Sequence, residues 1–483
     1  QCAAFIASDI KNAIHEGVGR EDIVAGLVYS ICMNYSNRVK GNRPVGAKVF
    51  MQGGVCYNRA VPLAMALLVG KPIVVPPEPG LMGAFGVALE VAARMEQGLL
   101  PEGDFDLETL AGREAAHGRS FTCKGGRERC DRRCPISVVE IEGRRYPFGG
   151  ACNRHENLRR DLHPDMAALD LVRLRQKLVF ETYGAPPAGA PAVRGRVGLN
   201  RSLLVNTFYP LYANFFRHLG FEPVLPAAPA PEGADRRGAP FCYPVELAHG
   251  FFESLLRTDP PPDWIFLPHL KAVPNQDPAT SAQSQVCPLV QGETFYLRTA
   301  FREPLARLAD RGTRLLTPLL NLSAGLAAAE APLVAAAVQM GIPRHRAREA
   351  FAVARQRQLD CLADMQAAGR RALAALEADP ERLAVAILSR PYNGFADEAH
   401  MGIPHKFASR GVTVIPMDFL DLEEVRSKRH MYWGMGKLIM KAARAVRRHP
   451  QLFGTYITNF SCGPDSFLIG YFREIMGRKP SLT

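Results

Sequence analysis

The segment Ser461-Cys462-Gly463-Pro464-Asp465 follows a predicted strand at Thr455 to Thr458 and places a cysteine in an elbow marked by proline. Two other cysteines stand in similar settings, in Phe241-Cys242-Tyr243-Pro244 and in Val286-Cys287-Pro288. Proline can extend neither a strand ladder nor a helix interior, so each thiol is expected at the end of an element. The carboxyl ends of strands converge in an α/β sheet, and ligands bind at that edge. We therefore expect the three thiols to meet.

Three converging thiolates match an iron–sulfur cluster in which one iron has no cysteine ligand. A structural interpretation is also open, because free cysteines commonly pack in a core as small apolar side chains. The spacing of Cys242, Cys287 and Cys462 does not decide between a 4Fe–4S site and a packed core.

Short apolar runs alternate with helical patterns on both sides of these cysteines. Strands are predicted at Val197 to Leu199, Pro223 to Leu225, Trp264 to Leu267, Leu383 to Leu388, Val412 to Ile415 and Thr455 to Thr458. An alanine-rich stretch at 300–378 is expected to form a helical layer or insertion. This rhythm predicts an α/β fold for residues 197–483, and the architecture predicted for the chain throughout is α/β with parallel sheets.

Residues 1–98 also read as α/β, with glycine-marked turns between strands and helices. Gln52-Gly53-Gly54-Val55 follows the predicted strand Lys48 to Met51 and precedes Asn58 and a helix. A second turn, from Pro76 through Gly83 to Gly86, has the same placement. Glycine lets a backbone approach a nucleotide closely, and a helix N-terminus favours phosphate. Tight turns without a ligand are the structural alternative.

The segment 112–160 is rich in cysteine and arginine and separates these two regions. Cys123, Cys130, Cys134 and Cys152 have the spacing Cys-x6-Cys-x3-Cys-x17-Cys in a segment with little apolar material. Four thiolates of this kind hold zinc or a 4Fe–4S cluster, and the sequence does not separate the two. Neighbouring cations would offset the thiolate charge; they are Lys124, Arg127, Arg129, Arg132 and Arg133. A helical stretch at 161–183 and an Ala/Gly/Pro linker at 184–196 follow.

Several polar residues accompany the predicted strand ends of the C-terminal region. Tyr392, Asn393, His400, Asp418 and Trp433 are expected near the three thiols, and Asp418 is expected to cap a helix beginning near Leu420. The histidines 249, 269 and 400 are interpreted as hydrogen-bonded polar residues rather than ligands. The remaining thiols, Cys32, Cys56 and Cys361, are interpreted as core.

Composition narrows the class of protein. The chain has 483 residues, eleven cysteines and a formal charge of +12. No apolar stretch reaches the roughly 20 residues of a membrane span, and no signal-peptide pattern opens the chain. An odd cysteine count without secretion signals favours metal or redox use in a cytoplasmic protein over disulfides. The positive charge would attract nucleotides, acyl-CoA phosphates or an acidic partner, or it reflects arginine-rich composition; no nucleic-acid-binding motif is present.

Strings in both regions resemble a known family. The first region resembles the C-terminal part of 2-hydroxyacyl-CoA dehydratase activators and benzoyl-CoA reductase ATPase subunits through the string Cys2 to Ile10, through Gln52 to Asn58 and through Pro76 to Gly86. Residues 197–483 resemble the dehydratase-like half of large activase-related fusion proteins. The matching strings there are Leu247-Ala248-His249-Gly250, Arg390-Pro391-Tyr392-Asn393 and Asn459 to Asp465.

The resemblance implies an actin/Hsp70-like ATPase subdomain at 1–98. It implies that Cys2 contributes to a 4Fe–4S cluster at a homodimer interface, and that Gly53, Gly54, Asn58 and Gly83 belong to an ATP/Mg site. It further implies that Cys242, Cys287 and Cys462 hold a cluster that receives an electron when ATP is hydrolysed. Partners would be a second copy or a dehydratase-like subunit, with acyl-CoA as a possible substrate.

The departures from the family pattern limit the activity expected of this chain. The family's phosphate-binding strands and catalytic acid are expected before Gln1, so the chain as given is interpreted as a fragment with half of an ATPase site. Three hypotheses remain: an ATP-dependent iron–sulfur electron-transfer protein, a zinc-stabilised binding or scaffold protein, and an electron-accepting acyl-CoA dehydratase-like subunit. No catalytic residue follows from the sequence.

Overall fold

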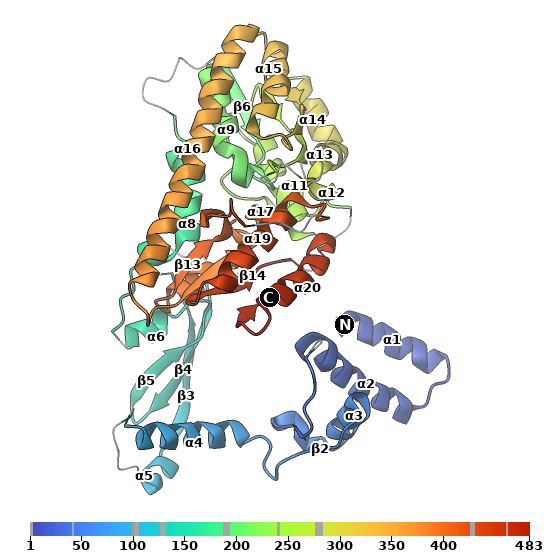
Figure 1. Ribbon diagram of the computed structural model, residues 1–483. Helices are drawn as coiled ribbons and strands as arrows, with labels where there is room; N and C mark the ends of the chain where they lie inside the picture. The colour runs from blue at the N-terminus through green and yellow to red at the C-terminus, as the bar shows by residue number, and fades with distance from the viewer. Residues whose placement is uncertain are drawn as a thin grey trace. The chain divides into compact units, whose positions relative to one another are not determined.

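A computed structural model describes residues 3–40, 43–98, 100, 106–125, 132–159, 161–186, 194–238, 242–275, 284–425, 430–459 and 462–483 (Figure 1). Two of the predicted site residues, Cys2 and Cys130, lie outside these ranges. The chain divides into two compact units, Gln1–Arg113 and Glu114–Thr483, and each is described by itself. None of the described helices has both the length and the apolar content needed to cross a bilayer.

The first unit is a small α/β assembly with one parallel strand pair. Strands β1 (Val49–Phe50) and β2 (Ile73–Val74) pair in parallel. Its helices are α1 (Ala3–His15), α2 (Arg20–Asn34), η1 (Tyr35–Lys40), η2 (Gly54–Tyr57), α3 (Ala60–Val69), α4 (Met82–Glu96) and α5 (Leu107–Ala111). Its core is small and includes Cys32, Val61 and Met65. The helices and strands predicted for residues 1–98 are present at shifted ends.

The second unit begins with an antiparallel sheet, where the sequence predicted only parallel sheets. Strands β3 (Ala115–Thr122), β4 (Pro135–Ile141) and β5 (Arg144–Phe148) pair in chain order and precede helix α6 (Arg154–Arg159). Glu142 and Gly143 join β4 to β5, and both have positive φ, at 50° and 73°. Positive φ at both central residues is the requirement of a type I′ hairpin turn, whose twist matches antiparallel strands. The parallel prediction is wrong for this segment.

Two parallel four-stranded sheets form the rest of the second unit. One has the order β10-β8-β6-β7, comprising Arg314–Leu316, Trp264–Phe266, Gly195–Leu199 and Phe221–Val224. The other has the order β13-β12-β14-β15, comprising Thr413–Pro416, Ala384–Leu388, Leu452–Tyr456 and Ser481–Leu482. A short parallel pair, β9 (His269–Ala272) with β11 (Leu319–Asn321), completes the strands. The mixed α/β class with parallel sheets is thereby confirmed for this region.

The stretch predicted as a helical insertion at 300–378 is not entirely helical, because β10 and β11 lie within it. Its helices are α14 (Arg302–Ala309), η6 (Leu326–Ala329), α15 (Glu330–Gln339) and the long α16 (Arg344–Glu377). The other helices of the unit are α7 (Met166–Leu169), α8 (Leu171–Gln176), η4 (Lys177–Thr182), α9 (Val205–His218), α10 (Pro231–Ala234), α11 (Tyr243–Leu256), α12 (Pro288–Gln291), α13 (Glu293–Ala300), α17 (Pro391–Gly394), α18 (Ile403–Ala408), η7 (Met417–Phe419), α19 (Gly434–Arg448) and α20 (Gly463–Met476).

Helix α16 joins the two parallel sheets into one core. It packs against α9 beside the first sheet and against β13 and η7 beside the second, and Figure 1 shows it running along both. Pro210 interrupts α9, and the buried Gln358 of α16 compensates for it. The Gln358 amide donates to the Thr207 carbonyl (3.2 Å), and its Oε1 accepts from the Leu211 N–H (3.2 Å). Because residues 207 and 211 would bond each other in an ideal helix, this side chain satisfies both groups beside Pro210.

Candidate functional site

Cys242, Cys287 and Cys462 line one cavity of about 70 Å³ in the second unit. Each is the residue that precedes a helix: Cys242 begins α11, Cys287 begins α12 and Cys462 begins α20. A proline stands in the first turn of each helix, where its fixed φ and missing N–H are tolerated best. The proline elbows of the sequence are therefore helix starts, and three of them face a common space.

The second parallel sheet supplies the other wall of this cysteine cavity. Strands β12 and β14 are neighbours, and the chain leaves their carboxyl ends at Arg390 and Asn459, which both line the cavity. Tyr392 joins them from α17, and the remaining lining is mostly apolar, consisting of Leu203, Val245, Leu289, Val290, Gly463 and Pro464. The site thus lies at the carboxyl edge of a parallel sheet, where ligands of α/β proteins bind.

Burial holds two of the three thiols in their protonated form in the metal-free protein. Burial raises the pKa of the Cys242 thiol. Burial, reinforced by the Asp465 carboxylate, raises the pKa of Cys462 to about 12. A ligand that takes thiolates must therefore displace protons when it binds.

A buried ion pair braces the cavity beside Cys462. The Arg390 guanidinium donates to Oδ1 of Asp465 through Nη2 (2.8 Å) and Nε (3.0 Å). Tyr456 Oη and Thr458 Oγ1 also donate to this carboxylate, at 3.0 and 2.6 Å. Burial alone would raise the pKa of Asp465, but Arg390 and these hydrogen bonds hold it below its ordinary value. Arg390 and Asp465 belong to strings that resemble the activase family, but the sequence alone assigns neither residue a role.

Two tyrosines add polar groups next to the thiols. Tyr392 Oη accepts a long hydrogen bond from Arg390 Nη1 (3.4 Å). The buried Tyr296 hydroxyl has no hydrogen-bond partner among the residues that the structure describes, and it interacts electrostatically with Cys242 and Cys287. His249 stacks on the Tyr296 ring with centroids 5.1 Å apart, which fixes the orientation of that ring. A buried hydroxyl without a partner is unfavourable unless a ligand accepts from it.

Three thiols are the donor set of an iron–sulfur cluster in which one iron has no cysteine ligand. Within the described ranges, no group of three or more His, Cys, Asp or Glu side chains is placed to hold one ion. A multi-iron cluster makes a different demand, because each thiolate binds a different iron and the sulfurs need not surround one point. The three thiols that line the cavity could each bind a different iron.

The other predicted companions of the thiols do not line the cysteine cavity. Asp418 caps no helix at Leu420; it lies in η7 and its carboxylate pairs with the Arg175 guanidinium at 2.7 Å. His400 accompanies Asp397 at 2.9 Å in a different cavity. Asn393 donates to the Ile457 carbonyl (3.4 Å), and Trp433 precedes α19. The thiols of Cys32, Cys56 and Cys361 are buried, as expected of core cysteines.

The glycine turns of the first unit lie side by side. The Gly53 N–H donates to the Pro79 carbonyl (2.7 Å), which joins the first turn to the second. Gly53 has φ +104°, a value that favours glycine, and an added Cβ at Gly54 or Gly83 would meet open space. Asn58 Oδ1 accepts from the Ala60 N–H (3.1 Å), so its side chain caps the start of α3. The role of these residues in nucleotide binding stays a prediction.

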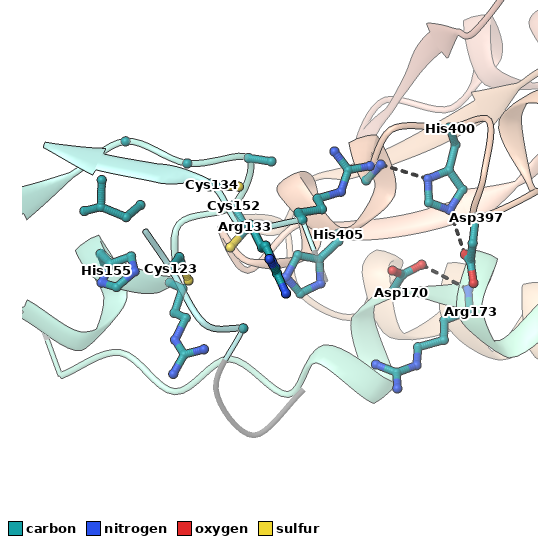
Figure 2. Close-up of a pocket in the computed structure, with 18 of the residues that line it drawn as sticks. Cys123, Arg133, Cys134, Cys152, His155, Asp170, Arg173, Asp397, His400 and His405 are labelled. Carbon is teal, nitrogen blue, oxygen red and sulfur yellow. Dashed lines mark hydrogen bonds and ion pairs between the residues drawn. The ribbon is translucent and has the colours of Figure 1, made fainter. Parts of the chain in front are cut away.

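A second cavity, of about 270 Å³, lies where the antiparallel sheet meets the α/β part of the same unit (Figure 2). Cys123, Cys134 and Cys152 line it together with His155, and Asp170, Asp397, His400 and His405 lie around its other end. The structure thus brings together three of the four cysteines predicted between 112 and 160. Burial lowers the pKa of His155, with a smaller contribution from Arg154.

Comparisons with known proteins relate the chain to activases of CoA enzymes. Residues 196–420 match the family model described as the CoA enzyme activase uncharacterised domain. A 2-hydroxyisocaproyl-CoA dehydratase activator of Clostridioides difficile is 39% identical over 88 residues, which are 18% of this chain and 33% of that protein. The chain thus spans about a third of the length of that relative. No solved structure matches the chain. The two matches identify an activase-related protein.

Proposed function

We propose that this activase-related protein is an iron–sulfur electron-transfer component that serves an acyl-CoA dehydratase and depends on ATP. The observation that carries the proposal is the cavity on which Cys242, Cys287 and Cys462 meet at three helix starts. A bound 4Fe–4S cluster would supply one-electron chemistry at low potential and one iron without a protein thiolate.

The residues around the cavity have distinct tasks in this proposal. Cys242, Cys287 and Cys462 hold the cluster once their protons have left. Arg390 places a buried positive charge beside Cys462, and the Tyr296 hydroxyl is a free donor to the sulfur of a cluster. Charge and hydrogen bonds of this kind set the reduction potential of iron–sulfur sites. The apolar lining excludes water, which strengthens each of these interactions.

ATP dependence and partner binding belong to the first unit in this proposal. The joined turns at Gly53 and Pro79 would contact adenosine in an ATPase subdomain of the actin/Hsp70 type, with Asn58 and Gly83 beside them. The variant Gly54→Val adds side-chain bulk where there is open space, so it should weaken binding of a fluorescent ATP analogue without loss of helical circular dichroism. Unchanged affinity for the analogue would remove Gly54 from the site.

We assign the exposed apolar side chains of the first unit to a partner-binding surface. Leu63, Leu67 and Phe85 are 68%, 77% and 57% exposed. Such side chains favour a protein contact when they are contiguous. A second copy of the chain or a dehydratase-like subunit would cover them. Light scattering measures the mass of the wild type and of Leu67→Glu, and a fall from dimer to monomer in the variant would indicate a contact between two copies.

The decisive experiment measures iron and acid-labile sulfide in the anaerobically produced chain. We expect about four of each, with the electron paramagnetic resonance signal of a reduced cluster on adding dithionite. The variants Cys242→Ser, Cys287→Ser and Cys462→Ser should each lose the signal. Cys361→Ser should keep it, because Cys361 lies within helix α16 and does not line the cavity. Iron-free wild-type protein, or a signal that survives all three substitutions, would contradict the proposal.

A further inference from the structure

The open end of the antiparallel sheet gathers three cysteines from two connections, the one between β3 and β4 and the one between β5 and α6. Cys123 directly follows β3, Cys134 directly precedes β4, and Cys152 lies between β5 and α6. The Cys123 N–H donates to the Cys134 carbonyl at 2.8 Å. A Cβ placed on Gly150 would lie 3.6 Å from Cys134 Cβ and 3.9 Å from the Cys152 carbonyl, so these two cysteines flank the same glycine. All three line the cavity of Figure 2.

His155, in the first turn of α6, lines the same end of that cavity. Its Nε2 is buried and has no hydrogen-bond partner within the part of the chain that the structure describes. The imidazole packs edge-on against Phe121 with ring centroids 5.4 Å apart, which fixes its orientation. A buried nitrogen without a partner costs free energy, and a metal ion would satisfy it.

We propose that Cys123, Cys134, Cys152 and His155 hold a structural zinc ion. Three cysteines and one histidine are an established tetrahedral donor set for structural zinc. The sequence spacing favours four cysteines including Cys130, which lies outside the described residues; among the described residues, His155 is the donor that we assign to the fourth position. This inference is independent of the electron-transfer proposal, because it uses none of the thiols at the other cavity.

Charge and packing both favour an ion at this end of the sheet. Arg132, Arg133 and Arg154 line the cavity and would offset the negative charge of three thiolates. Ile136 and Val138 are the only buried apolar side chains among the described residues of 114–159. So small a core gives little hydrophobic stabilisation, and a metal ion is the usual supplement in small segments of this kind.

Binding changes both the protonation and the rotamers of the site. Zn²⁺ takes three thiolates and one neutral imidazole, so three thiol protons are released to solvent and no oxidation occurs. The described donors do not yet form a group of three around one point. Binding of one ion therefore requires the cysteine side chains to rotate about Cα–Cβ toward the imidazole.

The test uses the full chain without an affinity tag, and compares four variants by elemental analysis and by titration with Co²⁺ after zinc removal. We expect about one zinc per chain in the wild type, in Cys130→Ser and in the control His163→Ala. His155→Ala should bind zinc roughly tenfold more weakly or worse, and His155→Cys should restore it. The Co²⁺ form should show thiolate charge-transfer bands that strengthen in His155→Cys, since a fourth sulfur then binds.

Three outcomes overturn the assignment. Zinc retained in His155→Ala but lost in Cys130→Ser would establish the four-cysteine set. Iron with sulfide in place of zinc, lost in Cys134→Ser, would establish a second cluster. Wild-type protein that folds without metal and does not take up Co²⁺ would leave these cysteines structural. Substituting Cys242, Cys287 and Cys462 together should leave zinc unchanged, which separates this test from that of the proposed function.

Discussion

The Arg390 guanidinium and the Asp465 carboxylate form a nearly solvent-free ion pair at 2.8 Å that joins the end of β12 to the first turn of α20. The two residues are 75 positions apart, and Cys462 lies three residues before Asp465. Arg390 lines the cysteine cavity, and Asp465 directly follows Pro464, which also lines it. The pair therefore positions one of the three thiols.

Removing one member of this pair should destabilise the second unit strongly. Arg390→Met or Asp465→Asn leaves an unpaired buried group, which typically costs roughly 3–5 kcal/mol in the free energy of unfolding. Both tryptophans, Trp264 and Trp433, lie in the second unit, so their fluorescence during guanidinium titration reports on it.

An exposed pair supplies the control for that comparison. Arg382 and Asp379 are 3.0 Å apart with side chains 65% and 44% exposed, so Arg382→Met should change the unfolding free energy by less than about 1 kcal/mol. The double variant Arg390→Met/Asp465→Leu should lose less than the sum of the single variants. An Asp465→Asn effect as small as that of Arg382→Met would mean that the pair does not brace the site.

Glu293 should make stability fall as pH rises. Its side chain is buried and accepts hydrogen bonds from Ser202 and Asn200; burial raises its pKa from 4.5 to about 7. The folded state holds the proton more tightly than the unfolded state. The stabilisation that Glu293 contributes is therefore fully present below pH 4.5 and is lost between pH 4.5 and about 7. It amounts to roughly 3 kcal/mol in the free energy of unfolding.

The variant Glu293→Gln should flatten that pH dependence and should be the more stable protein at pH 8. Unfolding free energies at several values between pH 4 and 8 measure the slope. Glu303→Gln, an exposed position on the next helix, should keep the wild-type slope. Parallel curves for Glu293→Gln and the wild type would show that Glu293 does not titrate in this range.

Two helical glycines should respond to alanine in opposite directions. A Cβ at Gly369 of α16 would lie 1.9 Å from the Phe419 carbonyl oxygen, whereas one at Gly470 of α20 meets open space. Gly470→Ala should gain about 0.5–1 kcal/mol from helix propensity. Gly369→Ala should lose roughly 2 kcal/mol or more, because α16 must move away from η7. Thermal melting of both variants checks this, and equal melting temperatures would contradict the close contact.

The Cys462 thiol should be slow to alkylate near neutral pH in metal-free protein. Its pKa of about 12 leaves little thiolate at pH 8, and the iodoacetamide rate should rise steadily as the pH approaches that value. Asp465→Asn removes a negative charge that raises this pKa, so alkylation at pH 9 should be faster. Mass spectrometry of the peptide measures the rate, with urea-unfolded chain as reference. A rate that levels off near pH 9 would contradict the raised pKa.

The sequence predicted the parallel strands well, because apolar runs such as Ala384–Leu388 are short, buried and bounded by breakers. Strand β10 was missed, since three residues of Arg-Leu-Leu within an alanine-rich stretch cannot be told from a helix by periodicity. The antiparallel sheet has a sequence signal, Glu142-Gly143 between two apolar alternations, and this dipeptide takes the positive φ values of a hairpin turn.

The convergence of the three cysteines was anticipated from proline elbows, whereas their surroundings were not. The partnership of Arg390 with Asp465 depends on two strands lying side by side, and a single sequence does not encode that distance directly. The burial of His155 Nε2 likewise depends on the packing of α6 near Phe121. In both cases the residue type indicates a possible chemical role, and tertiary packing determines which residues are placed to fulfil it.

The placement of each cavity cysteine at the start of a different helix has a consequence for biogenesis. Cys242 and Cys287 leave the ribosome long before Cys462, so the cavity wall is incomplete until α20 has been synthesised and docked against β14. A ligand that needs all three thiols can load only after translation has passed that point. Truncation before α20 would remove Cys462 and would leave the cavity without its third thiol.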